Sequence, residues 1–89
     1  MVTYEVRLTR SAQDAFERAD APLARKLARC FANLETEPRK HPNIRALRGK
    51  QAGLYRYRVG DHRVVYRIED DQRIVIVLTI AHRSEAYDD

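Results

Sequence analysis

Apolar and polar residues alternate at the start of the chain. Residues 2–8 read VTYEVRL, and this period of two is typical of a strand with one buried face, so we predict a strand over Val2–Leu8. From Ser11 to Ala19 the apolar residues recur at three- and four-residue spacing, which predicts a short helix. Either Ser11 or Thr9 can serve as its N-cap.

A second helix is predicted directly afterwards. Asp20-Ala21-Pro22 breaks the first helix and suits the start of another, because proline is tolerated in a first helical turn. Apolar residues then mark one face of a helix that ends before Pro38, namely Leu23, Leu27, Cys30, Phe31 and Leu34. The two helices should form a hairpin. The next segment, 38–50, shows little periodicity, and we expect Ile44 and Leu47 to tether it to the core.

Three antiparallel strands are predicted over Leu54–Val59, His62–Glu69 and Ile74–Ala81. Gly60-Asp61 separates the first two, and glycine in the first position suits a type II′ hairpin turn. This turn fixes the register: Val59 with His62, Arg58 with Arg63, Tyr57 with Val64, Arg56 with Val65, Tyr55 with Tyr66, and Leu54 with Arg67. Alternation then separates a core face, with Tyr55, Tyr57, Val64, Tyr66 and Ile68, from a cationic face, with Arg56, Arg58, Arg63 and Arg67.

The last strand is apolar throughout, which predicts a central strand covered on both faces. A three-residue loop at Asp70–Gln72 would direct Val75, Val77, Thr79, Ala81 and Arg83 to the arginine face and Ile74, Ile76, Leu78 and Ile80 to the core. A two-residue loop would exchange these faces. We favour the first, because it brings Arg83 to the other arginines. The predicted fold is α+β: an N-terminal strand, a two-helix hairpin and a three-stranded antiparallel meander in one sheet.

Composition narrows the class of protein. A chain of 89 residues has material for a single domain, residues 1–89, and 44% apolar with 34% charged residues excludes a disordered chain. No apolar run reaches the length of a membrane helix and no signal peptide is visible, so we expect a cytoplasmic protein without membrane contact. Cys30 is the only cysteine and has no partner at a ligand spacing. It should be a buried thiol, and we predict no metal and no cofactor.

Positive charge is concentrated in one part of the chain. The net charge is +4, and between Arg39 and Arg67 nine lysines and arginines accompany a single acid, Asp61. Like charges directly across a hairpin destabilise a sheet, so a bound anion would explain Arg58 opposite Arg63. The alternative is that these arginines extend into water. Guanidinium groups on one face suit phosphate oxygens, which they grip bidentately.

Cleavage of RNA needs more than cations. Because RNA supplies its own nucleophile in the 2′-OH, a metal-free nuclease needs a proton acceptor, a proton donor and charge stabilisation. His82, Arg83 and Tyr87 offer an imidazole, a guanidinium and a phenol in one segment. His82 could instead be a strand-end residue bonded to the backbone, and Tyr87 could pack the tail on the sheet. We expect His41 and His62 to lie on the surface.

Three stretches of the sequence resemble the RelE branch of the RelE/ParE toxin superfamily. They are Leu47-Arg48-Gly49, residues 55–68 (YRYRVGDHRVVYRI) and residues 81–87 (AHRSEAY). The resemblance implies a type II toxin that enters the ribosomal A site and cleaves mRNA there, without metal, by 2′-OH attack. Its implied site comprises catalytic Arg63, Arg83 and Tyr87, and substrate-binding Arg56 and Arg58, to which we add Arg48 and Lys50 of the basic loop.

Arginine is a poor proton acceptor, so a base role for Arg56 or Arg58 is doubtful. We therefore predict Tyr87 as the base, and Arg83 or His82 as the acid. The resemblance also implies a cognate antitoxin, the ribosome and mRNA as partners, with a monomeric free toxin and a hetero-oligomer with antitoxin. Two alternatives are a ParE-like inhibitor of DNA gyrase and a non-catalytic RNA-binding module.

Overall fold

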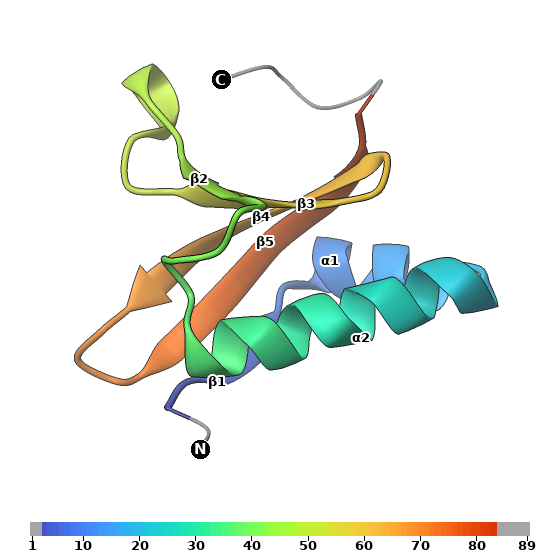
Figure 1. The fold of residues 1–89 in the computed structure, drawn as a ribbon, viewed down its shortest axis with the longest axis horizontal. Helices are drawn as coiled ribbons and strands as arrows, with labels where there is room; N and C mark the ends of the chain where they lie inside the picture. Colours follow the sequence, from blue (N-terminus) through green and yellow to red (C-terminus); the bar gives the residue numbers. More distant parts are fainter. Residues whose placement is uncertain (1–2, 84–89) are drawn as a thin grey trace.

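The fold is a five-stranded mixed sheet with two helices packed on one face (Figure 1). The computed structural model describes residues 3–83. Its elements are β1 (Glu5–Leu8), α1 (Arg10–Glu17), α2 (Ala21–Thr36), β2 (Ile44–Ala46), a short 3-10 helix η1 (Gly49–Gln51), β3 (Tyr55–Val59), β4 (His62–Glu69) and β5 (Ile74–His82). The strand order is β1-β5-β4-β3-β2, with β1 parallel to β5 and the other pairs antiparallel. The predicted α+β class and the order of its main elements are confirmed.

Side-chain caps start both helices. The Thr9 hydroxyl accepts a hydrogen bond from the Ala12 N–H at 3.3 Å and donates to the Leu78 carbonyl at 2.7 Å. Thr9, rather than Ser11, is therefore the N-cap of α1, and it also ties that helix to β5. The Asp20 carboxylate accepts from the Leu23 N–H at 3.0 Å at the start of α2, whose first turn holds a proline as predicted.

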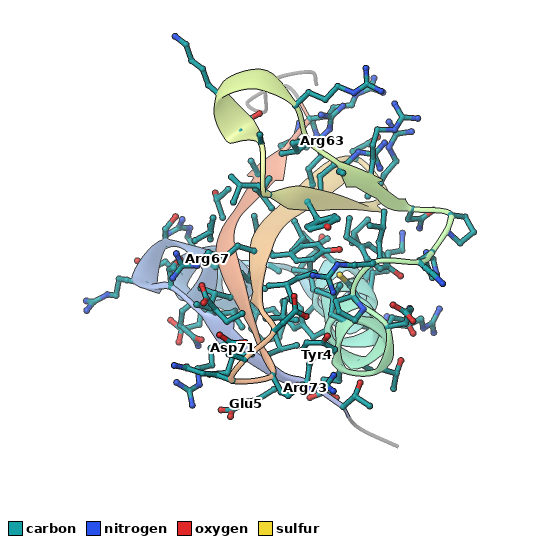
Figure 2. All side chains as sticks on the ribbon, turned by 90° about the vertical axis from the view of Figure 1, so that its left-hand side faces the viewer. Tyr4, Glu5, Arg63, Arg67, Asp71 and Arg73 are labelled. Atoms are coloured by element: carbon teal, nitrogen blue, oxygen red, sulfur yellow. The ribbon has the colours of Figure 1, made fainter. Side chains whose placement is uncertain are left out.

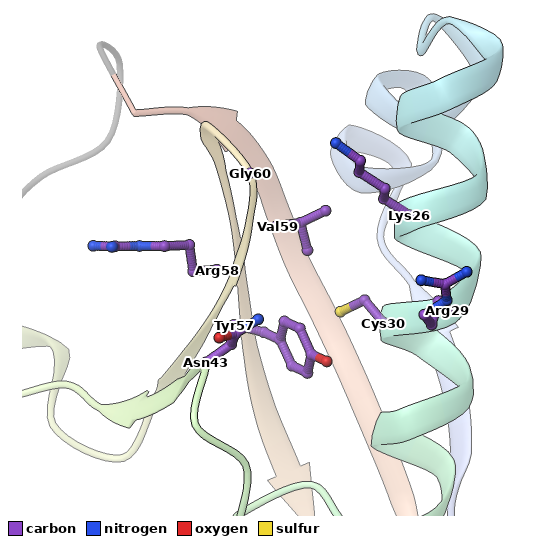
Figure 3. Close-up of a pocket in the computed structure, with 8 residues that line it drawn as sticks. All are labelled: Lys26, Arg29, Cys30, Asn43, Tyr57, Arg58, Val59 and Gly60. Atoms are coloured by element: carbon purple, nitrogen blue, oxygen red, sulfur yellow. The ribbon is translucent and has the colours of Figure 1, made fainter.

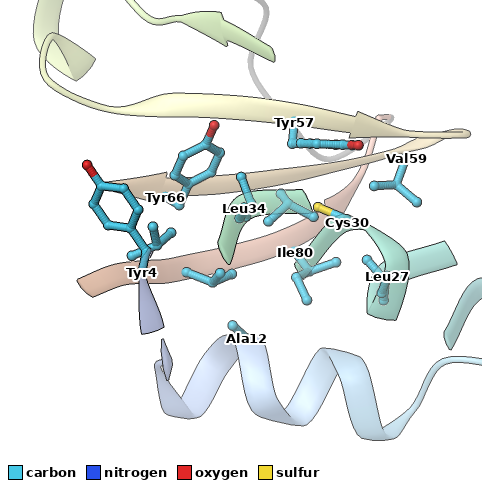
Figure 4. Packing of buried hydrophobic residues seen from close by; sticks show 12 residues of the cluster. Tyr4, Ala12, Leu27, Cys30, Leu34, Tyr57, Val59, Tyr66 and Ile80 are labelled. Carbon is cyan, nitrogen blue, oxygen red and sulfur yellow. The ribbon is translucent and has the colours of Figure 1, made fainter. Parts of the chain in front are cut away.

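The hydrophobic core lies between the helices and one face of the sheet (Figure 4). Leu27, Cys30 and Leu34 of α2 and Ala12 of α1 pack against the strand side chains of one face. Those side chains are Tyr57, Val59, Val64, Tyr66, Val75, Val77 and Ile80. Cys30 is buried, as predicted, and its burial raises the pKa of the thiol to about 12.

The β3–β4 hairpin has the predicted register. Five of the predicted pairs are present, from Val59 with His62 to Tyr55 with Tyr66, and Arg58 lies opposite Arg63. The sixth, Leu54 with Arg67, falls outside the ladder because β3 begins at Tyr55. Gly60 has a φ of 58° while the φ of Asp61 is not positive, and that combination defines the type II′ turn that the sequence predicted.

The register of β5 corrects the prediction for its first half. The loop before it has four residues, 70–73, so Glu69 lies opposite Ile74. Val75 and Val77 therefore belong to the core, whereas Ile74, Ile76 and Leu78, predicted as core residues, do not. The predicted three-residue loop was wrong because Arg73, with a φ of 57°, adds a left-handed residue that no glycine signalled.

A β-bulge restores the predicted faces in the second half of β5. Val65 pairs with Thr79 while Tyr66 pairs with Val77, so Leu78 is an extra residue that shifts the alternation by one. Beyond the bulge, Ile80 lies opposite Val64 in the core. Ala81 lies opposite Arg63, on the arginine face, as predicted.

Both helices pack on the same face of the sheet, and no helix of residues 3–83 covers the second face, which we call the open face (Figures 1 and 4). The expected cover on both sides of β5 is therefore not found in this range, although β5 does lie inside the sheet between β1 and β4. On the open face Ile74 is buried, while Ile76 is half-buried between the arginines Arg7 and Arg67 on the neighbouring strands. An apolar run can therefore be shielded by long charged side chains instead of a second layer.

The segment before β2 is fixed to the core by polar contacts. The buried hydroxyl of Tyr66 donates to the Pro38 carbonyl at 2.6 Å. Arg39 forms a bidentate pair with Asp70, at 3.1 and 2.7 Å, and Tyr4 donates to the same carboxylate at 2.9 Å. These contacts fix the position of the segment that leads into β2, a strand that the sequence analysis did not predict.

No helix among residues 3–83 is long and apolar enough to cross a membrane.

Candidate nucleic-acid interface

Arginines from three neighbouring strands gather on one end of the open face. Arg45 of β2 lies opposite Arg56 of β3, and Arg58 of β3 lies opposite Arg63 of β4. Alternation from Ala81 directs Arg83 to the same face, and the Arg83 N–H donates to the Asp61 carbonyl at 2.7 Å. We call these five residues, Arg45, Arg56, Arg58, Arg63 and Arg83, the arginine cluster. Figure 2 labels Arg63 of this cluster and Arg67, which lies further along β4.

Arg45 is a member that the sequence prediction missed. Its register position depends on β2, whose three residues are too few to show a period of two. The signal for this strand was Ile44, which we expected to tether the segment to the core. In the structure Ile44 lies opposite Tyr57 and packs against the core. Leu47, the other predicted tether, is buried but stands outside the core cluster.

Arg56 is buried, with only 7% of its surface exposed. Its Nη1 donates to the Asn43 carbonyl at 2.7 Å, so this guanidinium helps to hold the loop before β2 against the sheet. The structure therefore gives Arg56 a structural contact in addition to its place on the arginine face. Arg58, by contrast, is exposed.

Charges on the open face are segregated. At the end near the β4–β5 loop, Arg7 pairs with Glu5 at 3.0 Å and Arg67 pairs with Glu69 at 3.3 Å. At the opposite end, Arg45, Arg58 and Arg83 form no ion pair with any residue of the described range 3–83. These three exposed arginines therefore add positive charge to this end of the face without a carboxylate partner in the described part of the chain.

The basic loop lies beside this end of the sheet. Arg48 and Lys50 are both exposed, in or next to η1, which projects beyond β2 and β3 (Figure 1). Neither makes an ion pair within residues 3–83. The buried Leu47 anchors the base of the loop through a backbone hydrogen bond with Leu54 at 2.9 Å.

The structure separates His82 from the arginines. His82 lies opposite His62, with ring centroids 5.1 Å apart, and both line the helix side of the sheet. A donor on that side does not reach a phosphate held on the open face, so Arg83 remains as the predicted acid of the pair. Tyr87 lies outside the described residues.

Two of the described tyrosines are unsuitable as proton acceptors. Burial raises the pKa of the Tyr57 and Tyr66 hydroxyl groups, and both rings belong to the core. Tyr57 also accepts a hydrogen bond from Asn33 at 2.8 Å and stacks on His41 at 5.0 Å between ring centroids. His41 is consequently half-buried against the core and not a free surface residue.

The site defined by these residues suits a phosphodiester. Guanidinium groups present parallel N–H donors that match two oxygens of one phosphate, and several in one cluster stabilise the extra charge of a phosphorane-like transition state. Within residues 3–83 no group of three or more histidine, cysteine, aspartate or glutamate side chains is arranged to hold a metal ion.

Comparison with known proteins identifies the family. The profile of a family described as the ParE toxin of type II toxin-antitoxin system, parDE, matches residues 6–87. The curated Toxin RelG of Mycobacterium tuberculosis is 33% identical over 85 residues, which cover 94% of this chain and 95% of RelG. This chain belongs to the RelE/ParE family of toxins of type II toxin–antitoxin systems.

Solved structures agree with that assignment. The toxin–antitoxin complex RelBE2 from Mycobacterium tuberculosis contains a chain that is 29% identical, with a TM-score of 0.79 over 92% of this chain and 100% of that one. The archaeal RelE–RelB complex from Pyrococcus horikoshii contains a chain that is 27% identical, with a TM-score of 0.80 over 94% of this chain and 99% of that one.

Proposed function

We propose that this toxin is a ribosome-dependent mRNA endoribonuclease of the RelE kind, which cleaves in the ribosomal A site and so inhibits translation. The observation that carries the proposal is the register of the β3–β4 hairpin, which places Arg58 directly opposite Arg63 within the arginine cluster. Sheet stability does not favour that pair, whereas a phosphate between the two guanidiniums turns a repulsion into two charge-assisted contacts.

The proposed reaction uses the 2′-OH of the substrate as the nucleophile. Arg58 and Arg63 bind the scissile phosphate and stabilise its growing charge, with Arg45 and Arg56 beside them. Tyr87 acts as the base that accepts the 2′-OH proton, and Arg83 donates toward the leaving 5′-oxygen. Arg48 and Lys50 contact neighbouring phosphates of the mRNA. Because these residues suffice for acid–base chemistry and charge stabilisation, the proposed reaction needs no cofactor.

A cognate antitoxin is the proposed protein partner. The RelBE2 and archaeal RelE–RelB structures are toxin–antitoxin complexes, and their toxins share the fold over nearly the whole of this chain. The free toxin is proposed to be a cytoplasmic monomer and to form a hetero-oligomer with its antitoxin. The open, cationic sheet face offers a surface that an acidic segment of such a partner can cover.

A gyrase inhibitor is the second candidate function, because the matching family profile is that of the ParE toxin. The test is to add the protein to a translation extract and map mRNA 5′ ends by primer extension, with intact ribosomes and after ribosome removal. Our proposal predicts new ends at A-site codons that depend on ribosomes. Intact mRNA together with gyrase-dependent DNA breaks would replace it with the ParE-like function.

A further inference from the structure

A groove runs between helix α2 and the tip of the β3–β4 hairpin, on the face of the sheet opposite the arginine cluster. Its first part is a cavity of about 210 Å³ lined by Lys26 and Arg29 of α2, by Asn43 and by β3 (Figure 3). A second cavity of about 250 Å³ adjoins it and shares Lys26, Val59 and Gly60. We call these two adjoining cavities the helix groove.

The helix side of this groove is cationic. Helix α2 contains no acidic residue between its N-cap Asp20 and Glu35, so the exposed Lys26 and Arg29 have no carboxylate one turn away. Neither makes an ion pair within residues 3–83. The Lys26 ammonium lies 3.9 Å from the point where a β-carbon on Gly60 would stand, which places it directly at the hairpin turn.

Carboxylates offset little of this charge. None lines the first cavity. Two reach the second, but the Asp20 carboxylate already accepts the Leu23 N–H as the helix cap, and Asp61 is exposed at the turn itself. The positive charge of the groove is therefore concentrated at Lys26 and Arg29, in the first cavity, which Cys30, Tyr57 and Val59 also line.

The groove and the arginine cluster meet at the outer edge of β3. Arg58 lines the first cavity, yet its side chain extends to the opposite side of the sheet from α2 (Figure 3). β2 pairs with β3 only as far as Tyr57, and the last edge contact is the Arg58 N–H to the Asn43 carbonyl at 3.0 Å. A polyanion can therefore pass around Val59 and Gly60 from one cationic surface to the other.

We infer that the helix groove is a second binding site for the sugar–phosphate backbone of RNA, with Lys26 and Arg29 each neutralising a phosphate. This inference rests on the proposed function for the identity of the polyanion. The groove holds a stretch of RNA outside the reacting nucleotides, so it contributes to affinity and leaves the chemical step to the arginine cluster.

The test measures binding of the full-length protein to a short RNA oligonucleotide that is 2′-O-methylated throughout and so cannot be cleaved by 2′-OH attack. Fluorescence anisotropy over a series of salt concentrations gives the affinity and its salt slope. Lys26→Ala/Arg29→Ala should weaken binding about tenfold and reduce the slope by about 1.4, since each phosphate contact in a single strand contributes about 0.7. All the replaced side chains are exposed, and far-UV circular dichroism verifies folding.

A matched control removes two cations elsewhere on the helices. Arg10→Ala/Arg25→Ala loses the same charge from exposed positions that do not line the groove, and its salt slope should stay at the wild-type value. Equal effects of the two double variants, or a wild-type slope for Lys26→Ala/Arg29→Ala, overturn the inference. Loss of affinity for the antitoxin with unchanged RNA binding overturns it as well, in favour of a protein partner.

The outcome is separable from that of the proposed function. If the wild type cleaves no mRNA on ribosomes but its RNA affinity depends on Lys26 and Arg29, the groove stands and the nuclease proposal fails. If it cleaves mRNA and the groove variant binds RNA like the wild type, the nuclease proposal stands and the groove fails.

Discussion

Arg58 and Arg63 lie directly opposite each other on the open face of the β3–β4 hairpin. A sheet gains nothing from two facing guanidiniums, and the type II′ turn at Gly60 allows no slip in register that would separate them. At the other end of the same face, the arginines are paired with glutamates. Arg58, by contrast, makes no ion pair within residues 3–83, which supports our proposal that it binds an anionic ligand.

Replacing Arg58 should slow mRNA cleavage without lowering the stability of the fold. Arg58→Gln removes the repulsion across the hairpin, so we expect the free energy of unfolding to stay level or to rise by up to about 1 kcal/mol. Loss of one charge-assisted phosphate contact should slow mRNA cleavage about 10- to 100-fold. Urea denaturation and single-turnover cleavage on ribosomes measure the two effects.

Arg67→Gln is the matched control for that variant. It removes an arginine from the same open face, but one that is already paired with Glu69, so cleavage should stay near the wild-type rate. Equal losses of cleavage in both variants would show that the general charge of the face matters and that the Arg58–Arg63 pair does not.

Tyr87 is predicted to carry the proton from the 2′-OH. Tyr87→Phe keeps the ring and removes the hydroxyl, so the single-turnover cleavage rate should fall about 10²- to 10⁴-fold while antitoxin binding stays unchanged. Arg83→Ala should lower the same rate because it removes the predicted donor. Tyr55→Phe, a change of the same kind on the core side of the hairpin, serves as the control and should cleave normally. Full toxicity of both Tyr87→Phe and Arg83→Ala would rule out the proposed site.

The hydroxyl of Tyr66 should be essential to stability. Tyr66→Phe leaves the Pro38 carbonyl without its buried donor, and we expect a loss of about 1–3 kcal/mol in the free energy of unfolding. Tyr55→Phe removes a hydroxyl that accepts only a 3.3 Å contact from the exposed Arg39, so its loss should be smaller. Equal losses in urea denaturation would contradict this assignment.

Asp70 should make stability depend on pH. Hydrogen bonds from Arg39 and then Tyr4 hold the pKa of its carboxyl below the ordinary value. The ionised form is therefore favoured in the folded state, and its stabilisation is present above the ordinary pKa of about 4 and lost as pH falls below it. Asp70→Asn should be less stable than the wild type at neutral pH, and the difference should shrink in acid. Asp71→Asn, the neighbouring change, is the control for loss of one carboxylate from the same loop, and it should cost less stability than Asp70→Asn at neutral pH.

The hairpin and its arginine face could be predicted from sequence because their causes are local. Gly60 selects a two-residue turn, and a two-residue turn fixes every pair from Val59–His62 to Tyr55–Tyr66. The caps Thr9 and Asp20 and the apolar face of α2 follow from equally short-range rules. The α+β class needed no information beyond these elements.

The features that could not be predicted depend on partners distant in the chain. The bulge at Leu78 is bonded by Thr9, whose hydroxyl and N–H donate to β5 from 68 or more residues earlier, and no local pattern reveals such a contact. β2 exists only through its pairing with β3, and Arg45 was missed with it. His82 was grouped with Arg83 by proximity in sequence, although successive strand residues point to opposite faces.

The central claim is tested most directly by the chemistry of the cut. Purified ribosomes programmed with an end-labelled mRNA, with a known codon in the A site, are mixed with the toxin, and the 3′ terminus of the upstream fragment is analysed by mass spectrometry. Attack by the 2′-OH predicts a cut within the A-site codon that leaves a 2′,3′-cyclic phosphate. This cut should form more slowly with Arg58→Gln and should be absent from free mRNA. A 3′-hydroxyl terminus, a cut that needs no ribosome, or intact mRNA would contradict the account.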